Sequence, residues 1–271
     1  MIVEGSVTIE NTLDVQEMAN VCVVTGSVLI QSNATLTSFS FPVLESVGGG
    51  VVIESNATLT SISLPVLARA GSVFINGNAT LTSISLPVLE SAGGVFIESN
   101  ATLTSISLPV LASAGSVFIN GNATLTSISL PVLESAGGVF IESNATLTSF
   151  ALPVLASVGG HVSIQSNATL TSFSLPALAS AVGVFIQSNA TLTSISLPAL
   201  ASAGDVSIQS NDVLTSCTGL LIVNVGDCIQ GGTGGPGAIC SSGADCLPEL
   251  TCISNGTAST CVDLNAGKGE G

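Results

Sequence analysis

The sequence predicts an all-β fold: a parallel β-solenoid of about nine 22-residue coils, followed by a small disulfide-rich module at the C-terminal end. Three observations lead to this prediction. A 22-residue segment recurs almost unchanged along most of the chain, which is typical of solenoids. β-Branched residues, Ser, Gly and Pro fill every copy, which disfavours helix. Cysteines are dense only near the C-terminal end.

One asparagine marks each copy of the repeat. Successive asparagines are 22 residues apart, except for two steps of 23 residues, from Asn33 to Asn56 and from Asn144 to Asn167. The extra residues fall in glycine-bearing turns, where an insertion is tolerated best. We therefore expect an N-terminal cap over residues 1–25, a solenoid over 26–225 and a Cys-rich module over 226–271.

The first half of a copy predicts a strand. In the segment VFIN, Val73 and Ile75 alternate with Phe74 and Asn76, the period-2 pattern of a strand with one buried face. Each coil should add about 4.8 Å, the distance between neighbouring strands, so nine coils would make a rod about 43 Å long.

The second half of a copy predicts a shorter strand near Ser83–Leu86. Its apolar residues follow the pattern L-x-x-I-x-L-P-x-L. Pro87 should end the strand because it has no N–H to donate to a sheet. A glycine-bearing turn near residue 92 then returns the chain to the next coil.

Composition excludes several kinds of partner. The chain is 46% hydrophobic and only 7% charged, whereas a typical domain has about 25% charged residues. Its only basic residues are Arg69 and Lys268, against 17 acids, for a net charge of −15. This excludes nucleic acid, whose phosphates need a basic surface, and disfavours anionic membranes. We expect no membrane span, since no apolar run approaches about 20 residues.

Cysteine usage predicts an extracellular or cell-surface location. The opening MIVEGSVTIEN lacks the basic and apolar regions of a signal peptide, so we expect a mature form whose leader has been removed. Cys22, far from the others, is expected to be a small buried residue. The other six permit fifteen disulfide pairings, and none is assigned. These six are Cys217, Cys228, Cys240, Cys246, Cys252 and Cys261.

The motif GSVFI-x-x-N-x-x-LTSISLPVLESAGG resembles the receptor L-domain-like repeats of fungal cell-wall proteins and bacterial surface proteins. The opening EGSVTIENTLDVQEMANVCVVTGSVLI resembles the N-terminal cap of such repeats. The resemblance covers roughly residues 4–225 and implies a right-handed solenoid related to leucine-rich repeats, at the cell surface or outside the cell. The tail GAIC-SSGADC-LPELTC-ISNGTASTC is similar to small secreted cysteine modules.

The asparagine row has two competing interpretations. It can form an internal ladder in which side-chain amides bond neighbouring coils, which is the interpretation we favour. Its N-A-T sequences are also acceptors for N-glycosylation, as is Asn255-Gly-Thr, but a buried asparagine cannot carry a sugar. The acceptor asparagines are Asn33, Asn56, Asn78, Asn100, Asn122, Asn144, Asn167, Asn189 and Asn255.

A phenylalanine row is the first candidate interaction surface. If the strand alternation is right, these rings stack into an apolar stripe on the outside of the solenoid, and contiguous exposed apolar patches mark interfaces. The alternatives are that a loop or the tail covers the stripe, or that the row faces inward. The stripe consists of Phe74, Phe96, Phe118, Phe140 and Phe185.

Two threonine rows are the second candidate surface. Thr-x-Thr rows on a flat β-solenoid resemble the ice-binding faces of antifreeze proteins, where hydroxyl and methyl groups order water. The alternative is that threonine simply suits a solvated turn or strand. The candidate residues are Thr58, Thr60, Thr80, Thr82, Thr102, Thr104, Thr124, Thr126, Thr146 and Thr148.

No catalytic or metal-binding constellation is predicted. His161 is the only histidine, in an insertion turn. Glu54, Glu98 and Glu142 lie two coils apart, roughly 10 Å by strand spacing. That is too far for a calcium site and at the limit for a pair of glycosidase carboxylates. The cysteines have no histidine companions for zinc. We expect no enzymatic activity and no cofactor.

The sequence thus predicts a secreted or cell-surface structural or adhesive protein that self-assembles into an extracellular fibre. Its partner would be a second copy or another surface or matrix component. Ice binding through the threonine rows is the alternative. A carbohydrate-binding surface module is a further alternative, weakened because the chain has no Trp or Tyr to stack on sugars.

Overall fold

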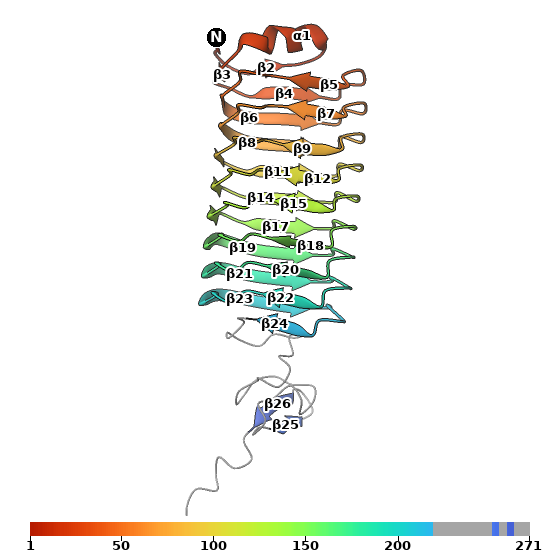
Figure 1. Cartoon of the computed structure of the whole chain (residues 1–271), viewed down its shortest axis with the longest axis vertical. Coiled ribbons are helices and arrows are strands. Elements are labelled where there is room, and N and C mark those ends of the chain that lie inside the picture. The colour runs from red at the N-terminus through yellow and green to blue at the C-terminus, as the bar shows by residue number, and fades with distance from the viewer. Residues whose placement is uncertain (219–250, 255–258, 263–271) are drawn as a thin grey trace, which may run out of the picture.

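The computed structural model describes residues 1–218, 251–254 and 259–262. It confirms the all-β fold: the chain winds into a parallel β-solenoid of about 10 turns with coils of about 22 residues. Figure 1 shows the coils stacked one on the next along a single axis. Each regular coil contributes one long strand or two shorter ones to a long sheet and one short strand to the opposite face.

The long sheet contains 15 strands and runs the length of the solenoid. Within the solenoid its pairings are parallel, and the register shifts only between Val47 and Gly50 and between Val158 and His161, at the two coils with an extra residue. Each position of the repeat therefore becomes a row along the axis; for example, Phe96 pairs with both Phe74 and Phe118. The strands are β1 (Ile2–Val3), β2 (Val7–Thr8), β3 (Val23–Val24), β4 (Val28–Gln31), β6 (Ser46–Glu54), β8 (Arg69–Asn76), β10 (Ser91–Ala92), β11 (Val95–Glu98), β13 (Ser113–Ala114), β14 (Val117–Asn120), β16 (Ser135–Ala136), β17 (Val139–Glu142), β19 (Ser157–Gln165), β21 (Ser180–Gln187) and β23 (Ser202–Gln209).

The opposite face consists of three-residue strands in three short parallel sheets. The predicted strand near Ser83–Leu86 is observed as Ser83–Ser85, and it ends before Pro87. These strands are β5 (Ser38–Ser40), β7 (Ser61–Ser63), β9 (Ser83–Ser85), β12 (Ser105–Ser107), β15 (Ser127–Ser129), β18 (Ser149–Ala151), β20 (Ser172–Ser174), β22 (Ser194–Ser196) and β24 (Ser216–Thr218).

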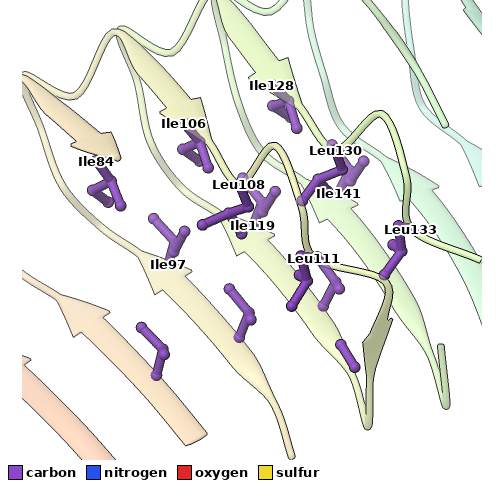
Figure 2. Close-up of a cluster of buried hydrophobic side chains, with 14 of the residues drawn as sticks. Ile84, Ile97, Ile106, Leu108, Leu111, Ile119, Ile128, Leu130, Leu133 and Ile141 are labelled. Atoms are coloured by element: carbon purple, nitrogen blue, oxygen red, sulfur yellow. The ribbon is translucent and has the colours of Figure 1, made fainter. Parts of the chain in front are cut away.

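The core lies between the two faces. Figure 2 shows Ile97 and Ile119 of the long sheet pointing towards Ile106 and Leu108 of the opposite side. All four side chains are at most 1% exposed. Burying each such side chain stabilises the fold by about 1.5–3 kcal/mol, and every coil repeats the same set. These apolar rows therefore have a structural role: burial of their side chains stabilises the solenoid.

A short helical segment lies at the N-terminal end of the solenoid (Figure 1). Helix α1 (Thr12–Glu17) is capped by Asn11, which forms a capping box with Asp14. The 3-10 helix η1 (Met18–Asn20) follows, and Met18 is 2% exposed against the first coils. The Glu10 carbonyl oxygen accepts a hydrogen bond from Asn33 Nδ2, so this segment also supplies the end of the asparagine row.

The predicted cysteine module falls largely outside the described residues, as do Cys228, Cys240, Cys246 and Asn255. Strands β25 (Thr251–Ser254) and β26 (Ser259–Val262) form an antiparallel pair in which Cys252 is the register partner of Cys261. Cys217 is buried on β24, at the register position of Ile195. Cys22 is a free thiol and is half-buried, not buried as expected, because it lies beside the chain terminus, where the Met1 ammonium contacts its sulfur.

One corner of every coil requires a left-handed backbone conformation. The residue immediately before each ladder asparagine has a positive φ, and in seven coils it is a serine, such as Ser99 with φ 54°. Gly77 and Gly121 occupy the same position with φ 66°. A Cβ in this region costs about 1 kcal/mol, so the serine coils carry strain that the glycine coils avoid.

Replacing Ser99 with glycine is therefore expected to raise the free energy of unfolding by about 0.5–1 kcal/mol. Urea denaturation followed by circular dichroism would measure the change. The control is Ser105→Gly in strand β12, where glycine should lower stability by a similar amount because it loosens an extended segment. Equal effects of the two substitutions would contradict the assignment of strain to this corner.

Candidate functional site

The asparagine row is an internal hydrogen-bond ladder. The side chains of all nine ladder asparagines, from Asn33 to Asn211, are buried. Asn100 shows the pattern: its Nδ2 donates to the Ile75 carbonyl oxygen at 2.9 Å and to Asn122 Oδ1 at 3.2 Å. Its Oδ1 accepts from the backbone N–H of Asn78 at 3.1 Å. The row therefore has a structural role, because it links each coil to its neighbours.

The ladder geometry is incompatible with N-glycosylation of the eight N-A-T sites in the folded chain. A glycan would be attached to Nδ2, the atom that donates inward to a buried carbonyl group in each coil. Among the nine acceptor sequences, only that of Asn255 lies outside the ladder.

We therefore expect at most one N-glycan on protein secreted by a glycosylating host, at Asn255. Intact-mass measurement before and after endoglycosidase treatment would count the glycans directly. The matched variant Asn255→Gln should then show no mass change on treatment. Two or more glycans on folded protein would contradict the ladder as the native state of these asparagines.

The phenylalanine row lies on the outward face of the long sheet. We call the residues of this row the Phe stripe; they are Phe74, Phe96, Phe118, Phe140 and Phe185, and all are half-buried. The first four form one continuous stack, with ring centroids 4.6, 5.3 and 4.1 Å apart in chain order and interplanar angles of at most 16°. Since stacking covers the ring faces, the surface that remains is a row of ring edges.

Glycines make room for three of these rings. A Cβ at Gly94 would lie 2.4 Å from Cε2 of Phe96, and Gly138 and Gly183 have the same relation to Phe140 and Phe185. Each of these rings therefore lies along its own strand, over the glycine two residues earlier. Phe74 and Phe118 are instead preceded by serines at this position. The coils thus alternate between a glycine and a serine form.

Ser163 interrupts the Phe stripe between Phe140 and Phe185. It is 3% exposed, and its hydroxyl donates to Glu142 Oε1 at 2.5 Å and accepts from Gln165 Nε2 at 2.6 Å. His161 lies next to this break, and its ring meets that of Phe185 edge-on with centroids 5.3 Å apart. A coil with serine in the row folds like its neighbours, since Ile164 remains fully buried.

Carboxylates and amides alternate beside the Phe stripe. We call this the acid–amide row. In it Glu54 pairs in register with Asn76, Asn76 with Glu98, Glu98 with Asn120 and Asn120 with Glu142. No two glutamates are register partners here, which keeps like charges two coils apart. The full row is Gln31, Glu54, Asn76, Glu98, Asn120, Glu142, Gln165, Gln187 and Gln209.

The threonine rows lie in the turns between the two faces, not on a strand. Their hydroxyls bond the preceding coil: Thr102 Oγ1 donates to the carbonyl oxygens of Ala79 and Leu81 at 3.0 and 3.1 Å. Thr104 Oγ1 donates to the Thr82 carbonyl oxygen at 2.9 Å. Most of these hydroxyls therefore hold coils together, which is a structural reason for threonine at these positions.

A second exposed apolar row was not anticipated from the sequence. At the corner after each short strand, the valine that follows proline is exposed, and we call these valines the Val ridge. Since proline ends the strand, the P-V dipeptide was itself a signal for an exposed corner. Later coils carry Ala177 and Ala199 instead. The ridge consists of Val43, Val66, Val88, Val110, Val132 and Val154, which are 36–41% exposed.

Among the described residues, no group of three or more His, Cys, Asp or Glu side chains is placed to hold a metal ion. In the same part of the chain, no helix is long and apolar enough to cross a membrane. Comparison of the sequence with protein-family models and with curated proteins, and of the structure with solved structures, gave no match.

Proposed function

We propose that this chain is a secreted or cell-surface structural or adhesive protein that self-associates through the outer face of its long sheet. The observation that carries the proposal is the continuous stack of Phe74, Phe96, Phe118 and Phe140 on that face. Apolar rings in an unbroken outward row favour association with another surface. No enzymatic activity is part of the proposal.

The N-terminal segment favours side-by-side over end-to-end association. Helix α1 lies at that end, and Ile9, Met18 and Val21 beside it are at most 2% exposed. An end-to-end contact there would have to form across a helix instead of a free strand edge. The long outer face has no such obstacle along the Phe stripe, where the rings remain half-exposed.

The resemblance to receptor L-domain-like repeats supports the proposed location. That resemblance also carries the finer parts of the fold proposal: a right-handed sense of winding, a relation to leucine-rich repeats, and disulfides among the six C-terminal cysteines. The near absence of basic residues is consistent with an extracellular component that has no nucleic-acid partner.

Sedimentation velocity and negative-stain microscopy of the purified chain would test self-association. We expect oligomers or laterally bundled rods that grow with protein concentration. A strictly monomeric chain at all accessible concentrations would overturn the proposal. The measurement should be made in the presence and absence of reductant, so that disulfide exchange through Cys22 is distinguished from association of the faces.

Ice binding remains the second candidate. The observation that favours it is the regular exposure of the second threonine in each turn, including Thr82, Thr104 and Thr126, at the spacing of the coils. Their methyl groups are available even where the hydroxyls bond the backbone. Measurable thermal hysteresis, lost in a Thr104→Lys, Thr126→Lys double variant that remains folded, would support it, and no hysteresis would exclude it.

A further inference from the structure

Three parallel rows form the outer face of the long sheet. The Phe stripe runs along the middle, and the acid–amide row lies two residues later on each strand. The third row lies two residues earlier, and we call it the small-residue row. Up to the end of the ring stack its members are Gly50, Ser72, Gly94, Ser116 and Gly138, and His161, Gly183 and Asp205 continue it. One flank of the stripe is therefore acidic, and the other is uncharged along the stacked rings.

We propose that a second copy of this chain covers the Phe stripe, with the two rods side by side and pointing in the same direction. The inference rests on the proposed function, self-association through this face, and adds the row that makes the contact and the orientation of the second copy. Three properties of the face lead to it: its period, its charge pattern and its size.

The period of the stripe favours a second copy as the occupant. Four consecutive coils present ring edges at the coil spacing, about 4.8 Å. An identical rod has the same spacing, so its rings can meet this row over every coil without loss of register. A partner whose side chains repeat at a different spacing would contact one or two rings in register and lose register with the others.

The charge pattern selects the parallel orientation. Two faces can meet through a two-fold axis that runs along the rods or across them. An axis across the rods makes the rods antiparallel and sets the acid–amide row against itself. With the axis at the centre of the four-ring stack, Glu98 faces Asn120 of the second copy, but the carboxylates of both copies gather in one line and the two Glu98 side chains are only one coil apart. An axis along the rods reverses the strand direction and sets this row against the small-residue row. Glu98 then faces Gly94 of the same coil in the second copy, and the two acidic rows lie on opposite sides of the stripe, about 13 Å apart by the rise of four residues along a strand, so like charges are kept apart.

The size of the face indicates a weak contact. A stable interface usually buries about 800 Å² on each partner, and four ring edges supply only part of that area. The flanking rows must therefore contribute, and the association should depend on concentration. Since the chain carries a net charge of −15, added salt should strengthen it by screening the repulsion between copies.

The chain itself supplies a substitution for testing the stripe. Ser163 and Ser207 occupy the same row, in coils whose core residues Ile164 and Ile208 are fully buried. The double variant Phe96→Ser, Phe118→Ser should therefore fold, and far-ultraviolet circular dichroism would verify this. In sedimentation velocity we expect its association to weaken at least about tenfold relative to the unchanged chain. The matched control is Val88→Ala, Val110→Ala on the Val ridge, which should associate like the unchanged chain.

Cysteine cross-linking tests the orientation. Leu29 and Phe185 lie in the same row, each two coils beyond an end of the four-ring stack. In a Cys22→Ser background, Leu29→Cys protein should form interchain disulfides with itself, because identical coils face each other in a parallel pair. In an antiparallel pair centred on the stack, Leu29→Cys would instead cross-link to Phe185→Cys in a mixture of the two proteins.

The outcomes separate this inference from the proposed function. If the phenylalanine variant associates as strongly as the unchanged chain, the Phe stripe is not the contact, while self-association itself stands. If mixed cross-links dominate, the parallel orientation is wrong. If the unchanged chain does not associate at all, both fail. If it binds only a different protein through the stripe, the second copy is not the occupant.

Discussion

Replacing Asn100 with alanine is expected to lower the free energy of unfolding by about 3–5 kcal/mol. The side chain accepts from Asn78 and donates to the Ile75 carbonyl and to Asn122, all within a buried row. Its loss leaves a backbone N–H and a backbone carbonyl group without partners, and each such group costs about 1–3 kcal/mol. Urea denaturation followed by circular dichroism would measure the change.

Asn76→Ala is the matched control, since it removes the same amide from the exposed acid–amide row of a neighbouring coil. Its effect should be within about 0.5 kcal/mol. Equal losses in the two variants would mean that burial of the ladder does not determine its contribution. Because a solenoid coil contacts only its neighbours, hydrogen exchange should show the weakening concentrated in the coils around residue 100.

Replacing Gly115 with alanine is expected to cost about 3 kcal/mol, because the new methyl group would meet backbone atoms. A Cβ at Gly115 would lie 1.9 Å from the carbonyl oxygen of Gly93, and one at Gly137 would lie equally close to that of Gly115. No side-chain rotation relieves such a contact, so neighbouring coils must shift. The thermal midpoint and the urea midpoint should both fall.

The control for this position is Ser116→Ala, the next residue, which lies on the outer face and should change stability by less than about 0.5 kcal/mol. The chain also contains an informative exception. Val182 occupies the position that Gly115 has in its own coil. The preceding coil has one extra residue, in the segment from Gly159 to His161, and pairing is irregular there. If alanine at Gly115 leaves stability unchanged, the regular coils can also accept a Cβ at this position, and the expected clash is wrong.

The fold was predictable because every copy of the repeat has the same pattern of buried and exposed residues. Alternation of Val73 and Ile75 with Phe74 and Asn76 gave the long sheet, and Pro87 gave the end of the short strand. The asparagine ladder followed from burial of a polar residue at a fixed position. The positive φ at Ser99 was missed because serine does not favour it, although Gly77 and Gly121 at the same position of the repeat were a signal for it.

The surface rows were less predictable than the core rows. Period-2 alternation indicates which way Phe96 faces, but not that its ring lies over Gly94, which requires the coordinates of neighbouring strands. The threonine hydroxyls illustrate the same limit: Thr102 was identified as exposed, whereas its bonds to the preceding coil depend on how two turns stack. The Val ridge was missed because valine is expected in the core.

The alternation in the acid–amide row constrains how the rod can change length. Removing one coil, for example the one that carries Asn76, would make Glu54 and Glu98 direct neighbours at about 4.8 Å. Removing two coils would leave every carboxylate beside an amide. Residues 71–114 and 115–158, which differ at three positions, are such a pair of units. Between Glu54 and Glu142, a change of two coils, 44 residues, therefore preserves the separation of the carboxylates, whereas a change of one coil does not.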